Sequence, residues 1–393
     1  MIDIFHNYRL QREELLARIA QELQLDKTRL DRMESAYNAV YDLLKKDETF
    51  FEDLDVEIYA QGSKRIGTTV KPINGQDFDL DTVLHIYDLY SKYTPTEIYN
   101  ALVRVIESND YYKSIYEKKD RCIRLNYKSD FHMDILPACM PNPYDKETIA
   151  IPEKLLQSWS IGNPKGFAKW FLQIAESVQS AMLRTYTRDL LEAKVESEPL
   201  PDELYLKTPL QRAVQLIKRY RDIYYQDKKH PVSSIVLTTL MARFYAGENS
   251  IFDTIDNVTQ KIKDSYLNTV KSNLRFKVLN PVNENEDFTD SWTSENYASF
   301  FNFIADFHKK WQMLKFDFET SNKEFILLFG EGIYKKSLTE QIKTFSNSSS
   351  NEFAKANGLI LGNSAFTDSK GQINSNQGIK NEPHHNFGGM QNS

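Results

Sequence analysis

The chain contains little cysteine and no long apolar segment, and both absences narrow the classes of protein it can belong to. Only two cysteines occur among 393 residues, Cys122 and Cys139, and their spacing is not that of paired metal ligands. So few cysteines favour a reducing compartment, where each behaves as a small apolar residue. No apolar run approaches the ~20 residues that a membrane-spanning helix requires, and no secretory signal is recognisable. We therefore expect a cytoplasmic protein that does not bind a membrane.

An excess of positive charge is lacking as well. Lysine and arginine number 49 against 55 aspartates and glutamates, which gives a formal net charge of −6. Broad capture of nucleic acid needs a clustered positive excess, so strong nucleic-acid binding is not expected. Hydrophobic residues at 41% and charged residues at 26% are ordinary for a soluble enzyme. The length allows two domains or one large bilobal unit.

A Gly-Ser turn followed by alternating carboxylates is the most informative stretch. Gly62 and Ser63 follow an apolar segment that alternates like a strand, and they offer backbone N–H groups and a hydroxyl to phosphates. Asp77, Asp79 and Asp81 lie two residues apart, so in a strand their side chains share one face. Mg²⁺ is held by such oxygen ligands together with substrate phosphates. The stretch therefore predicts a metal-dependent phosphate site, whereas the simpler interpretation is an acidic turn between two strands.

A third carboxylate lies in a later apolar segment. Residues 121–127 alternate like a strand, residues 128–130 suit a turn, and residues 131–137 read as a returning strand that Pro137 should end. Within it, Asp134 would be costly to bury without a partner. If Asp134 reaches the earlier aspartates across a sheet, the three can share the pair of metal ions that commonly serves displacement at phosphorus.

These stretches resemble the polymerase-β-like nucleotidyltransferases and, among them, the cGAS/DncV-like family, the CD-NTases. The resemblance is carried by Gly62-Ser63-Lys64-Arg65-Ile66-Gly67-Thr68, Lys71-Pro72, Asp77-Phe78-Asp79-Leu80-Asp81 and Asp134-Ile135-Leu136-Pro137-Ala138. It continues through Asn163-Pro164-Lys165-Gly166, the stretch 208–215 and Asn280-Pro281-Val282, and so covers about residues 30–340.

The family pattern assigns the metal ligands. It places the second ligand directly before an uninterrupted apolar strand, which favours Asp79 and Asp81 with Asp134 as the third; Asp77 is the alternative first ligand, paired with Asp79. The resemblance implies that these residues are catalytic and hold two Mg²⁺ ions, with Mn²⁺ as a possible substitute.

The resemblance also implies nucleotide-binding residues. Gly62 and Ser63 would hold the donor triphosphate, with Lys218 at the family's position for a phosphate-binding lysine and Ser233 at that for a serine. A solvated helix face would equally explain Lys218, and helix capping would equally explain Ser233 or Ser234. Arg121 and Arg124 could support an acceptor base or ribose. For His85 and His132 we expect structural roles.

The implied function is an enzyme, a nucleotidyltransferase that condenses NTPs, chiefly ATP or GTP, into a cyclic di- or trinucleotide with release of pyrophosphate. In bacterial relatives such a second messenger acts in anti-phage defence (CBASS) through a co-encoded effector. The alternatives are a nucleotidyltransferase that modifies a protein or an RNA end, and a regulatory nucleotide-binding module with an inactive site. The three carboxylates argue against the last.

The predicted fold is α+β and bilobal, with a mixed-sheet nucleotidyltransferase core and an all-helical second lobe. Domain boundaries are expected at 1–155 for the core, 156–345 for an oligoadenylate-synthetase-like helical lobe, and 346–393 for a flexible tail. Helices are predicted at 8–23, 28–45 with Thr28 as cap, 95–108, 164–184, 209–225, 231–246, 251–273 and 290–320. Capping boxes open the helices after Thr94 and Thr208.

The tail is rich in Asn, Ser, Gly and Gln from about residue 346 onward. Such composition buries too little apolar surface to offset chain entropy, which predicts flexibility. In some bacterial relatives an accessory protein acts on the C-terminus, and this tail is compatible with such a partner.

Overall fold

The computed structural model describes residues 4–73, 77–127, 131–153, 157–178, 207–316 and 318–347, together with three two-residue strands nearer the C-terminus. By its contacts the chain divides into two compact units. One runs from Ala20 to His308, and the other combines the segment up to Ile19 with the segment from Lys309. The candidate site lies wholly within the first unit.

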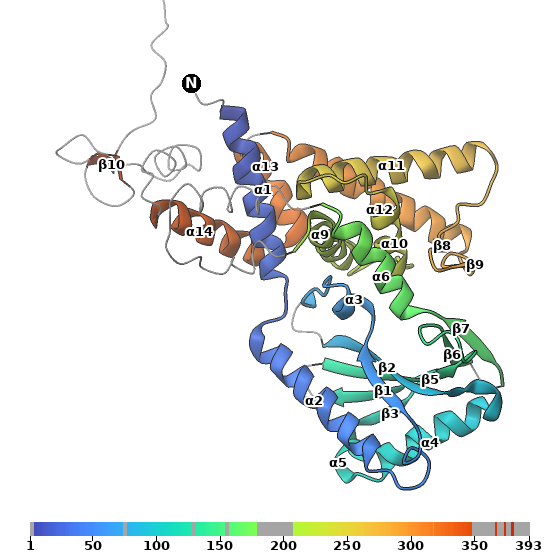
Figure 1. Ribbon diagram of the computed structural model, residues 1–393. Helices are drawn as coiled ribbons and strands as arrows, with labels where there is room; N and C mark the ends of the chain where they lie inside the picture. The colour runs from blue at the N-terminus through green and yellow to red at the C-terminus, as the bar shows by residue number, and fades with distance from the viewer. Residues whose placement is uncertain are drawn as a thin grey trace, which may run out of the picture. The chain divides into compact units, whose positions relative to one another are not determined.

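A mixed sheet forms the base of the first unit (Figure 1). Its described strands are β1 (Val56–Ala60), β2 (Phe78–Leu89), β3 (Tyr116–Lys118), β4 (Ile123–Tyr127), β5 (Phe131–Met140), β6 (Ile149–Pro152) and β7 (Trp159–Gly162). The order is β1-β2-β5-β4-β3, with β6 pairing β5 and β7. The two central strands β2 and β5 run parallel, whereas the other described pairs in this sheet are antiparallel.

The alternation of β2 separates the apolar core from the acidic face. Leu80, Leu84 and Ile86 point into a core shared with helices α2 (Lys27–Lys45) and α4 (Pro95–Glu107). The opposite face carries Asp79 and Asp81, as period-2 alternation predicts. The same strand therefore anchors the fold and presents the carboxylates.

Pro137 does not end β5, contrary to the sequence prediction. The strand continues to Met140. Pairing with β4 stops at Ile135 and pairing with β6 starts at Cys139, so Pro137 lies in a gap where β5 has a described neighbour on one side only. A missing N–H is tolerated at such a position.

Of the helices that cover the core, α4 begins at its predicted cap and α2 does not. The capping box of Thr94 and Glu97 opens α4, and the short helices α5 (Asp110–Ile115), α3 (Gly62–Arg65) and a 3₁₀ turn at Tyr90–Lys92 join the strands. The predicted cap of α2 was wrong. Asp26 rather than Thr28 caps it and accepts a hydrogen bond from Arg29 N at 2.9 Å.

A helical part follows the sheet along the chain. It contains α6 (Pro164–Ala175), α9 (Pro209–Tyr224), α10 (Ser234–Phe244), α11 (Ile251–Lys271) and the start of α12 (Ser294–Met313). The capping box of Thr208 and Gln211 is confirmed. The α+β class and the helical second part are also confirmed, with one addition: a hairpin of β8 (Leu279–Asn280) and β9 (Asn283–Asp287) interrupts the helices.

Several predicted boundaries differ from the observed ones. Helix α6 ends at Ala175 rather than near 184, and α10 begins at Ser234 rather than at Pro231. The range 290–320 holds all of α12 and the start of a further helix at Phe318, because a turn follows Met313. Strand β7 was missed, since Trp159–Gly162 is short and only half-buried and has no clear alternation.

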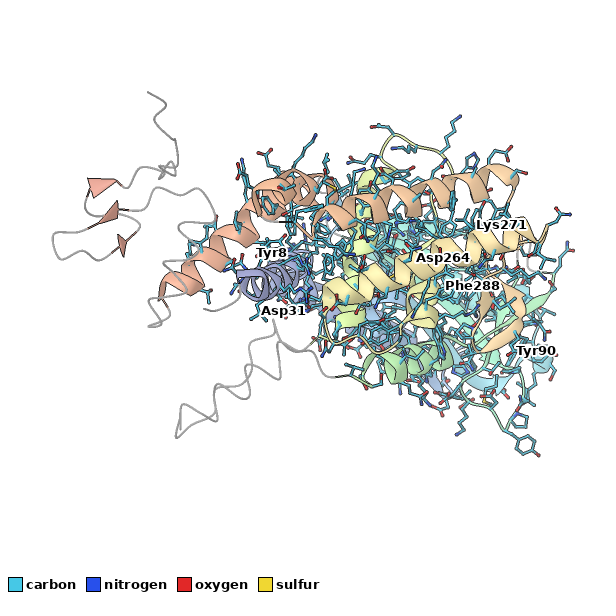
Figure 2. The ribbon with its side chains drawn as sticks, turned by 90° about the horizontal axis from the view of Figure 1, so that it is seen from above. Tyr8, Asp31, Tyr90, Asp264, Lys271 and Phe288 are labelled. Carbon is cyan, nitrogen blue, oxygen red and sulfur yellow. The ribbon has the colours of Figure 1, made fainter. Side chains whose placement is uncertain are left out.

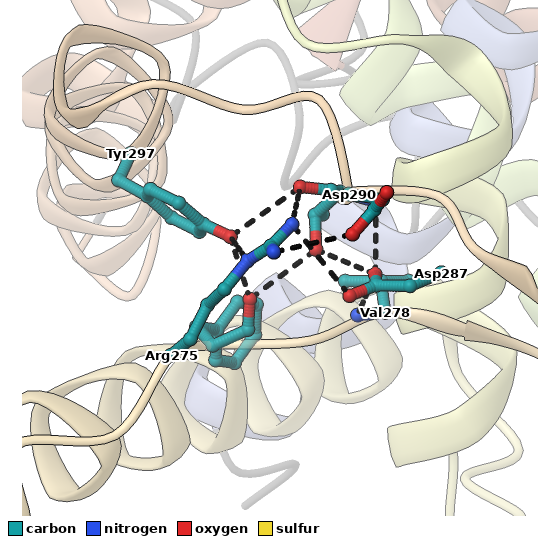
Figure 3. Close-up of polar contacts among 7 residues, drawn as sticks. Arg275, Val278, Asp287, Asp290 and Tyr297 are labelled. Atoms are coloured by element: carbon teal, nitrogen blue, oxygen red, sulfur yellow. Dashed lines mark hydrogen bonds and ion pairs between the residues drawn. The ribbon is translucent and has the colours of Figure 1, made fainter.

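Arg275 fixes the β8–β9 hairpin to the segment that follows it (Figure 3). Its guanidinium donates to Tyr297 Oη at 3.0 Å and to Asp290 Oδ1 at 3.2 Å, and also to the backbone carbonyl of Thr289. Asp287 Oδ2 lies 3.9 Å from the same guanidinium. Phe288, labelled in Figure 2, therefore lies between two residues that Arg275 holds.

We expect Arg275→Ala to raise the KM for nucleotide roughly 3–10-fold with little change in kcat, because the hairpin contributes to the wall of the cavity described below and not to its carboxylates. Steady-state kinetics would measure both constants. Lys277→Ala, an exposed position in the same segment, is the matched control. A loss in kcat alone would contradict the interpretation of the hairpin as a binding wall.

Buried hydrogen bonds join the two chain segments that make up the second unit. It contains most of α1 (Ile4–Glu22), with α13 (Phe318–Phe329) and α14 (Glu331–Asn347). Tyr8 Oη donates to Leu314 O at 2.8 Å, and Gln341 Nε2 donates to Gln11 O at 2.7 Å. None of the helices described in either unit combines the length and apolarity needed to span a bilayer.

Some predictions fall outside the described residues: the turn at 128–130 and nearly all of the tail. In the tail, β10 (Phe366–Thr367) pairs with β11 (Ile373–Asn374) and β12 (Ile379–Lys380). The domain boundaries near 155 and 345 stay a prediction.

Candidate active site

The parallel pairing of β2 and β5 places the predicted carboxylates side by side. Asp81 is the register partner of Asp134, and Asp79 lies one pleat repeat before Asp81 on the same face. Their exposure differs: the Asp79 side chain is 55% exposed, whereas that of Asp134 is 17% exposed. The sheet thus gathers two aspartates from β2 and one from β5, as the sequence pattern predicted.

Arg124, which the sequence suggested as one support for an acceptor base or ribose, contacts two of these carboxylates. Arg124 is the partner of Asp134 in the antiparallel β4–β5 register. Its Nε and Nη2 donate to the two carboxylate oxygens of Asp134 at 2.7 and 2.8 Å, and Nη2 lies 3.1 Å from Asp79 Oδ1. Hydrogen bonding to Asp134 raises the pKa of the guanidinium, which therefore stays charged.

The surroundings of Asp81 disfavour the ionised form of its carboxyl group. Burial, followed by the negative charges of Asp134 and Asp79, raises the pKa of Asp81 to about 6. Arg124 and Lys218 oppose this shift by smaller amounts. A group in such surroundings gains stability when a further cation approaches it.

The chemistry of these groups fits a divalent metal ion. Hard cations prefer carboxylate oxygens, and Asp81 lies buried beside the negative charges of Asp134 and Asp79. As the side chains lie, however, no group of three acidic, histidine or cysteine side chains in the described part of the chain is arranged to hold one ion. Arg124 contacts two of the three carboxylates in this arrangement.

Gly62 allows the Gly-Ser turn to approach Asp81. Its φ of +58° lies in the left-handed region, and a Cβ added there would come within 2.9 Å of Asp81 Oδ2. The backbone N–H of Gln61 also donates to the carbonyl of Asp81 at 2.9 Å. Ser63 follows at the start of α3, and its hydroxyl lies 3.3 Å from Thr69 Oγ1. The turn and the strand that carries Asp81 are therefore held directly against each other.

Three side chains from one face of α9 brace the segment after this turn. Gln211 Nε2 donates to Ile66 O at 3.0 Å, Gln215 Nε2 to Thr69 O at 2.8 Å, and Lys218 Nζ to Thr68 Oγ1 at 3.1 Å. Spacings of four and three residues place side chains on one helix face. The two glutamines were missed as part of the site, although that spacing in 208–218 was a signal in the sequence.

Lys218 lies at the predicted position but is not a solvated surface residue. It is 5% exposed, and burial followed by repulsion from Arg221 lowers its pKa to about 7. The nearby negative charges of Asp222 and Asp81 oppose that shift. A buried ammonium that faces a cavity is suited to an anionic ligand.

Ser233 occupies the N-cap position of α10, but its side chain makes no capping hydrogen bond. The neighbouring Ser234 hydroxyl accepts a hydrogen bond from Arg221. Capping, the simpler explanation for Ser233, is therefore not realised in the structure. Its hydroxyl is placed on the wall of the cavity.

These groups surround a cavity of about 1100 Å³ between the sheet and the helical part of the first unit. Its lining includes residues of four kinds: the Gly-Ser turn, the β2 aspartates, the polar residues of α9 and α10, and the β8–β9 hairpin with Phe288. Gly62, Ser63, Asp77, Asp79, Asp81, Lys218 and Ser233 all line it, whereas Asp134 does not. The volume is at the upper end of the range for ligand pockets, so it suits more than one small ligand.

Asp77 and the two histidines lie outside the group that Arg124 forms with the three paired carboxylates, although Asp77 lines the cavity. Asp77 lies just before β2, with its Oδ2 3.6 Å from His132 Nε2. His85 is fully buried against Tyr59 and Tyr87 with no described hydrogen-bond partner, and burial lowers its pKa to about 4. A neutral ring packed in this way is consistent with the structural role expected for His85.

Comparison with known proteins places the chain among nucleotide second-messenger enzymes. Residues 11–174 match a family model described as a Second Messenger Oligonucleotide or Dinucleotide Synthetase domain. A c-di-GMP synthase of Roseivirga ehrenbergii is 40% identical over 354 residues, which cover 88% of this chain and 92% of that protein.

Solved structures show the same fold at lower identity. The CD-NTase CdnG of Bradyrhizobium diazoefficiens, in complex with GTP, superposes with a TM-score of 0.68 at 23% identity, covering 84% of this chain and 98% of that one. CdnC of E. coli MS115-1, in complex with a HORMA protein, gives a TM-score of 0.58 at 12% identity over 81% and 97% of the two chains.

Proposed function

Since the chain belongs to the second messenger oligonucleotide or dinucleotide synthetase family, the CD-NTases, we propose that it joins two molecules of GTP into cyclic di-GMP. Family membership makes the protein a nucleotidyltransferase of the cyclic dinucleotide synthase type. Each of the two bonds forms when a ribose hydroxyl attacks an α-phosphate and pyrophosphate leaves. The choice of guanine follows the name of the 40% identical relative.

The observation that best supports this proposal is that a single cavity is lined both by hydrogen-bond donors for a triphosphate and by carboxylates suited to metal ions. The Gly62–Ser63 turn and Lys218 supply donors for a triphosphate, and Asp79 and Asp81 supply oxygens on the adjacent strand. The cavity is large enough to suit two nucleotides, as a condensation requires.

The protein groups divide into binding and reacting roles. Backbone N–H groups of the turn, the Ser63 hydroxyl and Lys218 hold the donor triphosphate, with Ser233 as a further contact. Asp134 orients the acceptor hydroxyl or accepts its proton. Asp79, Asp81 and Asp134 would hold the two Mg²⁺ ions, and Mn²⁺ could replace them. When bound, such ions stabilise both the attacking and the leaving oxygen.

The cellular setting is proposed from the family. We place the protein in the cytoplasm, where its product activates a co-encoded effector during phage infection. An accessory protein that acts on the C-terminal tail is compatible with this setting. A solved relative at 12% identity is bound to a HORMA protein, and at that identity the complex assigns no partner to this chain.

The test is direct. The full chain is incubated with all four NTPs and either Mg²⁺ or Mn²⁺, treated with phosphatase, and the surviving molecules are identified by mass spectrometry. We expect cyclic di-GMP from the wild type and none from Asp79→Ala.

Other outcomes would redirect the assignment. A surviving product with other bases would keep the synthase activity and reject guanine specificity. Labelled protein or extended RNA, with no phosphatase-resistant nucleotide, would favour the alternative transferase. Product from Asp79→Ala equal to that of the wild type would reject the proposed site.

A further inference from the structure

We propose that Arg124 competes with divalent cations for Asp79 and Asp134, so that the carboxylates accept metal readily only when a nucleotide triphosphate draws the guanidinium away. The inference rests on the metal site of the proposed function. It adds a residue that controls when that site can be loaded.

The contacts of Arg124 are those of a bound cation. Its two bonds to Asp134, at 2.7 and 2.8 Å, engage both oxygens of that carboxylate, and its Nη2 approaches Asp79 Oδ1 at 3.1 Å. The guanidinium side chain is 24% exposed and that of Asp134 is 17% exposed, so water screens the pair only in part. Bidentate pairs of this kind are among the stronger polar contacts in proteins.

The sheet holds the arginine in this position. Arg124 lies directly opposite Asp134 in the β4–β5 register, and Asp134 lies beside Asp81 in the β2–β5 register. The three residues therefore form a row across neighbouring strands. Side chains that are direct cross-strand partners meet without any distortion of the backbone.

A divalent cation needs the oxygens that Arg124 occupies. With the guanidinium in place, both oxygens of Asp134 and one oxygen of Asp79 are already engaged. Arginine binds phosphate in the same forked geometry as carboxylate. Arg124 does not line the cavity itself, but Asp79, which it contacts, does. A triphosphate that binds beside Asp79 therefore offers Arg124 an alternative partner and releases the carboxylates when the metal is required.

The experiment measures Mn²⁺ binding to the nucleotide-free full chain, by the paramagnetic resonance signal of free Mn²⁺. Arg124→Gln removes the competing charge, and we expect it to bind Mn²⁺ roughly tenfold to hundredfold more tightly than the wild type, the value of a charged hydrogen-bonded pair. Arg124→Lys keeps a positive charge without the fork and should fall between the two. Arg121→Gln is the matched control, because Arg121 pairs with Glu153 at 2.9 Å at the start of the same hairpin and the net charge changes equally.

The outcomes separate this inference from the metal site itself. Tighter binding in Arg124→Gln that disappears in Arg124→Gln/Asp81→Asn, with Arg121→Gln close to the wild type, supports competition. Equal or weaker binding in both Arg124 variants overturns it and leaves the metal site standing. If Asp81→Asn changes binding in neither background, the Mn²⁺ lies elsewhere and the proposed metal site fails together with the inference.

Discussion

Asp81→Asn is expected to abolish product formation and to stabilise the folded protein at neutral pH. The activity should fall roughly 10²–10³-fold or more, since the substitution removes one charged ligand from the site where charge develops. The same change removes a buried carboxylate that Asp134 and Asp79 repel. A gain in stability that accompanies a loss of activity is typical of residues placed for function.

The stability gain has a defined dependence on pH. The pKa of Asp81 is raised to about 6 in the folded protein from an ordinary 3.8. Between these values the folded state binds more protons than the unfolded state, so the wild type loses stability as pH rises through this interval. Asparagine does not titrate. The difference should therefore be about 2–3 kcal/mol at pH 8 and should shrink as pH is lowered towards 4.

Denaturant unfolding at pH 8 and pH 5 would measure this difference. Asp42→Asn removes an exposed carboxylate from α2 and is the control for a change in net charge alone. If Asp81→Asn destabilises the protein at pH 8, then the attraction of Arg124 and Lys218 outweighs the repulsion and the balance described here is wrong.

Gly62→Ala should cost activity almost as heavily, at roughly 10²-fold. The new methyl group would lie 2.9 Å from Asp81 Oδ2 at a residue whose φ is +58°. The chain can relieve this contact only by moving the turn or the carboxylate, and displacements of about 1 Å commonly cost that much. We expect kcat to fall more than KM rises, because the carboxylate is the group displaced.

Gly332→Ala is the matched control for this substitution. Gly332 lies in α14, and a Cβ added there would meet nothing within 4 Å. Alanine favours helix there, so activity should be unchanged and stability unchanged or slightly higher. Full activity in Gly62→Ala would show that the turn does not position Asp81.

Local sequence rules predicted those parts of the fold that depend on neighbouring residues. Both capping boxes were predicted because each is complete within four residues, and the alternation of β2 gave the acidic face. Thr28 was predicted as the cap of α2, whereas Asp26, two residues earlier and of a residue type that is preferred at N-caps, takes that position. Pro137 was misjudged because its neighbours across the sheet are set by pairing that no local pattern records.

The candidate site likewise contains residues that the sequence predicted and contacts that it did not. The aspartates and the Gly-Ser turn were predicted from spacing and resemblance. The structure brings the turn and the β2 aspartates to one cavity and places Asp134 beside Asp81 in the sheet. The actual partner of Arg124 depends on the register between two strands, and the β8–β9 wall is fixed by Arg275, which precedes it on a loop. Such contacts are set by tertiary structure, so a single sequence gives no sign of them.

Gln211 contacts the chain at positions 67 and 208, so substitutions at these three positions depend on one another. Its Oε1 accepts a hydrogen bond from Thr208 N at 3.0 Å, which completes the start of α9, while its Nε2 donates to Ile66 O at 3.0 Å. A side chain at Gly67 would come within 2.8 Å of that same Nε2. A larger residue at position 67 would displace the Gln211 amide, and a smaller residue at 211 would lose both its hydrogen bond from Thr208 N and its hydrogen bond to Ile66 O. We expect positions 67, 208 and 211 to co-vary among relatives as a single inherited unit.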